Sequence, residues 1–228
     1  METKNTRKKI TVKEIVLIGM FCALAYAVMF LSKMIPINVA GFLTFDLKDV
    51  IIIICGFMMG PVPAVIVSVI TSVIEMLTVS STGYIGLLMN VISTCAFVVP
   101  AAIFYKKHRK FAGAIIGIII GILCMTLVMM LWNWLITPLY MGVPRKVVAS
   151  MLLPVFLPFN ALKGGINAAA AILLYKPVVL VLRKARLAKD SPSGQTAKKK
   201  GLSIGAALAS IFVLATLILL VLVWTKVI

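Results

Sequence analysis

The feature that most constrains this chain is a series of long apolar runs separated by short polar or basic stretches. The run near residues 15–34 and the run near residues 111–137 are each long enough to cross about 30 Å of hydrocarbon as a helix. Hydrophobic residues make up 62% of the chain and charged residues 13%, whereas soluble domains average about 45–50% and about 25%. We therefore expect an all-α polytopic membrane helix bundle. The composition excludes a soluble enzyme, a disordered protein and a soluble nucleic-acid binder.

The apolar runs predict seven membrane segments and three regions of the chain. The runs cover about residues 15–34, 47–59, 63–79, 84–105, 111–137, 147–182 and 202–224. The sixth run is too long for one straight span and contains Pro154 and Pro158, so we expect a kink or a preceding interfacial turn. The regions are a six-helix core over 1–186, a basic cytoplasmic linker over 187–201, and an additional C-terminal transmembrane helix within 202–228.

The distribution of charge predicts the orientation of the chain in a cell membrane. Lys and Arg total 23 against 6 Asp and Glu, which gives a formal net charge of +17. The basic residues cluster before the first run, at 106–110 and at 183–200, and alternating spans place these clusters on one side. The positive-inside rule then predicts a cytoplasmic N-terminus and, if the seventh run spans, an external C-terminus. Because the clusters lie between apolar runs, we expect membrane lipid as a partner and no nucleic acid.

Residues suited to catalysis or metal binding are scarce. His108 is the only histidine and lies in a basic cluster. The four cysteines lie singly inside apolar runs, and no nucleotide-binding P-loop motif occurs. We therefore expect no catalytic residues, no metal site, no cofactor and no enzymatic activity.

Polar and aromatic side chains gather near the predicted outer ends of the runs. Asn160 and Lys163 share one helix face, which Asn167 continues. A lysine in an apolar helix is costly unless it faces a cavity or a partner. Lys163 therefore either forms a salt bridge with Glu75 or meets the polar edge of a ligand. The residues of this outer cluster are Thr44, Asp46, Gly83, Tyr84, Gly86, Asn90, Trp132, Asn133, Trp134, Thr137, Tyr140, Asn160, Lys163 and Asn167.

Small residues form two ladders that permit close helix contact in lipid. The first ladder is Gly19, Ala23 and Ala27, and the second is Gly113, Gly117 and Gly121. Each ladder is consistent with packing inside the bundle or with docking to another membrane subunit.

Several short motifs resemble one family of transport proteins. The stretch F-L-x-F-D-x-x-D covers residues 42–49, S-S-T-G covers 80–83, and P-F-N-A-L-K-G covers 158–164. Together they resemble the substrate-binding membrane subunit of energy-coupling factor (ECF) vitamin transporters, of the riboflavin type. The resemblance extends over about residues 10–186, so the seventh run lies outside it.

This resemblance implies a six-helix vitamin-binding core that takes up riboflavin. It also implies docking, through the ladder Gly19, Ala23 and Ala27, to a transmembrane coupling subunit that works with two cytosolic ATPase subunits. The expected ligand-binding residues are Phe42, Leu43, Thr44, Gly86, Asn90, Asn133, Tyr140, Asn160 and Lys163. Lys48 departs from the family pattern, and we expect its long side chain to snorkel outward.

Other readings of the residues remain open at this point. A related subunit could bind another vitamin such as thiamin, biotin or pantothenate, although an anionic vitamin favours more basic residues than Lys163 alone. An autonomous secondary carrier normally needs more buried carboxylates. A membrane enzyme acting on lipid head groups needs a nucleophile–base pair, a metal or paired carboxylates.

Overall fold

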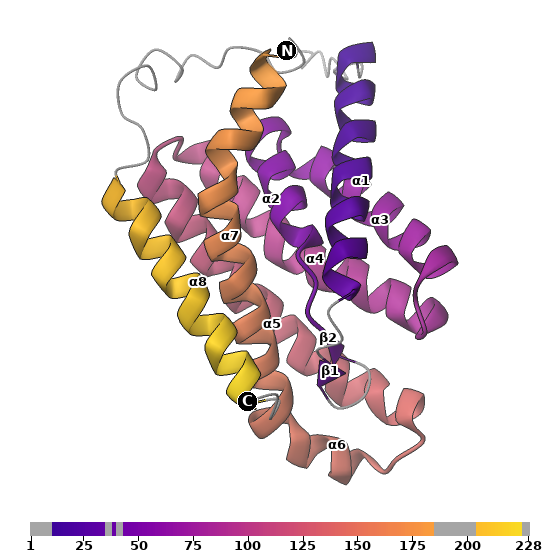
Figure 1. The fold of residues 1–228 in the computed structure, drawn as a ribbon. Coiled ribbons are helices and arrows are strands. Elements are labelled where there is room, and N and C mark those ends of the chain that lie inside the picture. Colours follow the sequence, from indigo (N-terminus) through magenta and orange to yellow (C-terminus); the bar gives the residue numbers. More distant parts are fainter. Residues whose placement is uncertain (1–10, 35–37, 40–42, 185–203, 225–228) are drawn as a thin grey trace, which may run out of the picture.

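The computed structural model describes residues 11–34, 38–39, 43–184 and 204–224, which form a bundle of helices with one small sheet (Figure 1). The helices are α1 (Val12–Lys33), α2 (Lys48–Met59), α3 (Pro61–Thr78), α4 (Gly83–Lys107), α5 (Phe111–Met141), α6 (Arg145–Met151), the π-helical turn η1 (Leu152–Phe156), α7 (Leu157–Lys184) and α8 (Ile204–Trp224). Between α1 and α2, strand β1 (Asn38–Val39) pairs antiparallel with strand β2 (Leu43–Thr44). The expected helical class is confirmed. The small sheet was not expected.

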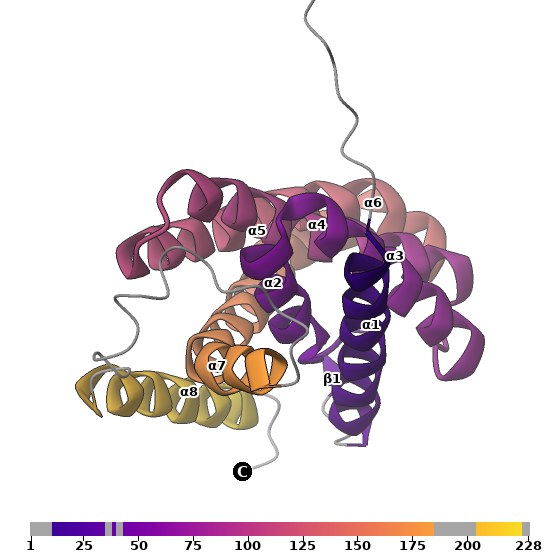
Figure 2. The ribbon, with the colours of Figure 1, turned by 90° about the horizontal axis from the view of Figure 1, so that it is seen from above.

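Helix α2 forms the centre of the bundle. All nine of its residues from Lys48 to Gly56 are buried, and the helix packs against α1, α3, α4 and α7 (Figure 2). Its continuous apolar run suits a helix that is surrounded on all sides. At its end Gly60 adopts φ +100°, a conformation open mainly to glycine, and Pro61 then begins α3. This turn lets the short α2 and the longer α3 pack against each other.

The sixth apolar run bends, as its prolines predict. It forms α6, then η1, then α7, and Figure 1 shows α6 running at an angle to α7. Pro154 lies within η1, where the N–H of Leu157 bonds to the carbonyl of Leu152 across five residues. A proline has no N–H to donate, and a π-helical turn is a recognised way to accommodate such a gap. The bend places the first turns of α7 beside the sheet.

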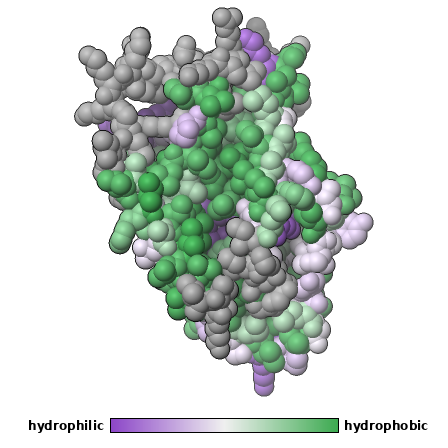
Figure 3. All heavy atoms as spheres, in the orientation of Figure 1, coloured by the Kyte–Doolittle hydropathy of each residue, from purple (hydrophilic) through white to green (hydrophobic). Residues whose placement is uncertain are grey.

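The outer surface of the bundle is largely apolar, as a membrane protein requires. Figure 3 shows hydrophobic side chains over much of one face. Among the described residues, five helical stretches are long and apolar enough to cross a membrane, namely α1, α3, α4, α5 and the stretch from Arg145 to Val181. Helix α8 packs along α7, so the seventh apolar run is helical as expected. Residues 187–201, the expected linker, lie outside the described part of the chain.

The two small-residue ladders have different surroundings. A Cβ at Gly117 would lie 2.8 Å from the carbonyl oxygen of Ala101 in α4, and one at Gly121 would collide with the carbonyl of Phe97. The second ladder therefore serves close packing of α5 on α4. By contrast, Gly19, Ala23 and Ala27 are exposed, and nothing lies within 4 Å of a Cβ at Gly19.

The ladders yield a matched pair of stability predictions. Gly117→Ala is expected to lower the free energy of unfolding by about 1–3 kcal/mol, because the new methyl group overpacks against a backbone carbonyl. Gly19→Ala is expected to leave stability unchanged or to raise it by about 0.5–1 kcal/mol through helix propensity. Thermal unfolding of both variants in the same detergent measures the difference. Equal midpoints would show that the α4–α5 contact is less tight than described.

Candidate ligand-binding site

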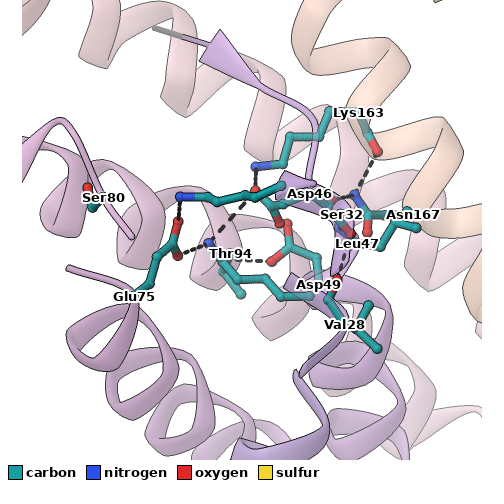
Figure 4. A network of polar contacts seen from close by, with 12 residues as sticks. Val28, Ser32, Asp46, Leu47, Asp49, Glu75, Ser80, Thr94, Lys163 and Asn167 are labelled. Atoms are coloured by element: carbon teal, nitrogen blue, oxygen red, sulfur yellow. Dashed lines mark hydrogen bonds and ion pairs between the residues drawn. The ribbon is translucent and has the colours of Figure 1, made fainter. Parts of the chain in front are cut away.

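A network of six charged side chains lies inside the bundle, near the sheet (Figure 4). The members are Lys33, Asp46, Lys48, Asp49, Glu75 and Lys163. They come from α1, the segment 45–47, α2, α3 and α7. Lys48 and Asp49 are fully buried, and only Lys33 has a substantially exposed side chain, at 20%. Among the described residues, the ion pairs of this network join the three lysines to Glu75 and Asp46, and none of them includes Asp49.

Glu75 is the acceptor for two of the three lysines. Lys48 Nζ donates to Glu75 Oε2 at 2.7 Å, and Lys33 Nζ lies 2.7 Å from Glu75 Oε1. The expectation that Lys48 snorkels outward is therefore wrong. Its side chain turns inward because a carboxylate on α3 compensates its charge, and an exit to solvent would leave Glu75 with one partner fewer.

Asp46 is the acceptor for the third lysine. Lys163 Nζ donates to Asp46 Oδ2 at 2.9 Å, and Lys48 Nζ lies 3.8 Å from the same oxygen. The alternative in which Lys163 pairs with Glu75 is thus not what the structure shows. Asp49, one helical turn further on, accepts a 2.6 Å hydrogen bond from the Thr94 hydroxyl of α4.

The segment 45–47 is held by its backbone as well as by its charge. The carbonyl of Asp46 accepts a hydrogen bond from Asn167 Nδ2 at 3.0 Å, and the N–H of Leu47 donates to the Ser32 hydroxyl at 3.3 Å. The ring of Phe45 lies 4.7 Å, centre to centre, from that of Phe159. These contacts fix the end of strand β2 between α1 and α7.

A cleft opens beside this network and encloses about 310 Å³ of unfilled space, counting the part open to the outside. The lining residues are Leu43, Thr44, Met89, Asn90, Ser93, Met129, Phe159, Asn160 and Lys163. Five of these residues were expected from the sequence: Leu43, Thr44, Asn90, Asn160 and Lys163. They come from β2, α4 and α7.

A second cleft of about 260 Å³, counting the part open to the outside, neighbours the first and shares Met89 with it. Two further expected residues, Gly86 and Tyr140, line it together with Trp132 and Thr137. The expected site is therefore divided between two neighbouring spaces along α4 and α5.

Asn133 and Phe42 stand apart from the other expected residues. Asn133 is fully buried and lines neither cleft. Its Nδ2 donates to the carbonyl of Met129 at 2.7 Å, and its Oδ1 accepts from the Thr137 hydroxyl at 2.8 Å. Phe42 lies outside the described residues.

Four apolar or hydroxyl-bearing residues of the first cleft were missed by sequence reasoning: Met89, Ser93, Met129 and Phe159. Met and Phe are common in any membrane helix, so composition alone did not mark them. Phe159 could have been found, because it precedes Asn160 in the quoted P-F-N-A-L-K-G motif.

The polar groups of the first cleft are chemically distinctive. Among the described residues, no hydrogen bond engages the side chains of Thr44, Asn90 or Ser93. Asn160 Nδ2 donates to the Phe156 carbonyl at 2.8 Å, which leaves its Oδ1 available as an acceptor. The one lining charge, on Lys163, is already balanced by Asp46. The cleft thus offers hydroxyl and amide groups between apolar walls without excess charge.

Fold and site together define a multi-pass membrane protein with a cleft for a small, polar-edged ligand. Comparison with known proteins gives the family: residues 13–175 match the description "ECF transporter, substrate-specific component". This chain belongs to that family, which makes it a transporter subunit and not an enzyme.

Curated relatives agree with this assignment. "Riboflavin transporter RibU" of Staphylococcus aureus (strain TCH60) is 29% identical over 189 residues, which are 79% of this chain and 99% of the relative. "Riboflavin transporter FmnP" of Bacillus subtilis (strain 168) is 26% identical over 77% of this chain and 98% of the relative. A solved structure of the S component of a bacterial ECF transporter superimposes with a TM-score of 0.64 at 28% identity, covering 75% of this chain and 98% of that one. None of these matches indicates a cofactor.

Substitutions in the buried network are expected to lower the free energy of unfolding by different amounts, depending on how deeply the substituted side chain is buried. Glu75→Gln is expected to lower the free energy of unfolding by about 3–5 kcal/mol, because the buried ammonium of Lys48 keeps only the Asp46 carboxylate at 3.8 Å, which Lys163 already engages at 2.9 Å. Lys33→Gln is expected to cost no more than about 1 kcal/mol, because its side chain reaches the surface and Lys48 still balances Glu75. Denaturant unfolding in detergent micelles compares the two. Similar small losses would contradict the description of Glu75 as the hub of the network.

Proposed function

We propose that this chain is the riboflavin-binding S subunit of an ECF-type transporter. In this proposal it binds riboflavin at the outer face of the cell membrane and delivers it by docking to a shared transmembrane coupling subunit with two cytosolic ATPase subunits. The names of the relatives support riboflavin as the ligand. The family description, a substrate-specific component of an ECF transporter, supports a chain that binds the substrate while other subunits complete the transporter.

The observation that carries the choice of ligand is the charge balance of the cleft. Lys163 lines it, but Asp46 accepts from its ammonium at 2.9 Å, so the site holds no unbalanced charge. An anionic vitamin such as biotin or pantothenate favours an unpaired cation, and a cationic one such as thiamin favours an unpaired carboxylate. Riboflavin is uncharged and needs neither.

The lining groups also suit the two halves of riboflavin. Its flat ring system favours apolar walls such as those of Met89, Met129 and Phe159. Its pyrimidine edge carries carbonyl and N–H groups that can bond to Lys163 and to the free Oδ1 of Asn160.

The remaining expected residues take subsidiary roles in this proposal. The ribityl hydroxyls are assigned to Thr44 and Asn90, with Leu43 beside them. Gly86 and Tyr140 extend the site into the second cleft. Asn133 contributes through its bond to Thr137, and Phe42 remains a sequence-based candidate.

The orientation and the docking surface complete the proposal. The basic clusters favour a cytoplasmic N-terminus, an external C-terminus, a core over 1–186, a linker over 187–201 and an added membrane helix within 202–228. The exposed ladder Gly19, Ala23 and Ala27 is proposed as the face that docks to the coupling subunit.

Asn160→Ala tests the ligand assignment. We expect riboflavin binding to weaken by about 1–3 kcal/mol, because a hydrogen bond to the ring edge is lost in a buried site. Lys163→Ala is expected to weaken binding at least as much, but it also leaves Asp46 unpaired, so Asn160→Ala is the cleaner variant. Quenching of flavin fluorescence measures the dissociation constant, with the exposed Ser150→Ala on α6 as control. Equal constants for all three variants would remove Asn160 and Lys163 from the site.

Ala23→Leu tests the docking face separately from binding. The bulky side chain is expected to prevent close approach of another membrane helix, so riboflavin uptake by cells should fall at least tenfold while binding to the purified chain stays unchanged. Ala215→Leu, at an exposed alanine on α8, is the matched control and should leave uptake intact. Normal uptake with Ala23→Leu would show that docking uses another surface.

A further inference from the structure

Helix α8 lies beyond residues 13–175, the part of the chain that matches the family. It nevertheless packs along α7 with one defined face (Figure 1). Leu214, Leu217, Val221 and Trp224 form this face, and Val221 is almost completely buried. Their spacing of three and four residues is that of one helix stripe. Phe212 and Leu219, on other sides of the helix, are 73% and 59% exposed.

The part of α7 that α8 contacts is the back and one flank of the stripe that lines the cleft. Leu162 and Ile166 form a buried cluster with Val221, and a Cβ at Gly165 would lie 3.0 Å from Leu217 Cδ1. In a helix with 3.6 residues per turn, Gly165 lies nearly opposite the stripe that carries Asn160 and Lys163, whereas Leu162 and Ile166 lie on the flank of that stripe. Helix α8 therefore supports α7 from the back and one flank of the cleft-lining stripe.

The cluster to which α8 contributes Val221 also borders the segment that carries Asp46. Phe45 and Leu47, the two neighbours of Asp46, pack against the cluster formed by Leu162, Ile166 and Val221. Sequence neighbours of both partners of the Lys163–Asp46 ion pair thus belong to the cluster that α8 completes.

Trp224 adds a contact at the wall of the cleft. It packs against a second cluster, which contains Leu43 and Phe159. These two residues line the first cleft, one from strand β2 and one from α7. The end of α8 therefore packs against the cluster that supplies this part of the cleft wall.

We infer that α8 is a brace that positions the ligand-binding site, by holding α7 and the segment 43–47 in the geometry that riboflavin requires. This inference rests on the proposed function. In a bilayer, apolar side chains that lose a helix neighbour gain lipid contacts in return, so the brace adds little to overall stability. Its effect is to restrict the wall and the Lys163–Asp46 pair to one arrangement, which favours a bound ligand.

Trp224→Ala in the full-length chain tests this role. In lipid nanodiscs, riboflavin is expected to bind about tenfold more weakly, which corresponds to about 1.4 kcal/mol, with most of the change in the dissociation rate. Trp224→Phe should restore most of the affinity, because an aromatic ring still packs against the cluster that contains Leu43 and Phe159. Leu217→Ala should give a smaller loss in the same direction. The thermal unfolding midpoint should change little in all three variants.

Two exposed positions on the same helix provide controls. Phe212→Ala and Leu219→Ala should leave the affinity within about twofold of the unmodified chain, because neither side chain faces α7. Affinity unchanged by both Trp224→Ala and Leu217→Ala would overturn the inference, while riboflavin binding by the unmodified chain would leave the proposed function standing. A loss of affinity matched by a large fall in the unfolding midpoint would also overturn it, because α8 would then stabilise the fold generally. Failure of the unmodified chain to bind riboflavin would remove both proposals.

Discussion

The structure depends on the placement of five ion-paired side chains inside an apolar bundle: Lys33, Asp46, Lys48, Glu75 and Lys163. A buried ion is stable only when a partner of opposite charge and further hydrogen bonds replace its lost water. Glu75 joins Lys33 of α1 to Lys48 of α2, and Asp46 joins the segment before α2 to Lys163 of α7. These pairs fix four helices relative to one another. Apolar side chains select one helix arrangement less strongly than these ion pairs do, because they pack about as well against lipid as against another helix.

This constraint shapes the ligand site. Because Asp46 accepts from Lys163 and its carbonyl accepts from Asn167, the end of strand β2 is tied to α7. The cleft between them presents a lysine whose charge is already balanced, with hydroxyl and amide groups and apolar walls around it. The same physical arrangement that makes a lysine tolerable in the bundle also makes the cleft suitable for an uncharged, polar-edged ring.

Much of the fold was predictable because it is encoded locally. Apolar runs give helices, Pro154 and Pro158 predict the bend of the sixth run, and both follow from neighbouring residues. The charge pairs were not predictable, because Asp46 and Lys163 are 117 residues apart and several carboxylates could have been the partner. Lys48 was predicted to extend outward because its partner, Glu75, lies 27 residues away and could not be identified from the sequence. Seven of the nine expected ligand residues line the two clefts. Asn133 does not, because its amide donates to the Met129 carbonyl of its own helix, and residue spacing alone does not predict that bond.

The central claim is that the outer cleft holds riboflavin. It is tested most directly by identifying the small molecule that stays with the chain after purification from cells grown with a mixture of vitamins. The account predicts yellow protein that absorbs blue light, and mass spectrometry of the denatured sample should find riboflavin in amounts approaching one per chain. Colourless protein that releases no flavin, or protein that releases a different vitamin, would contradict it.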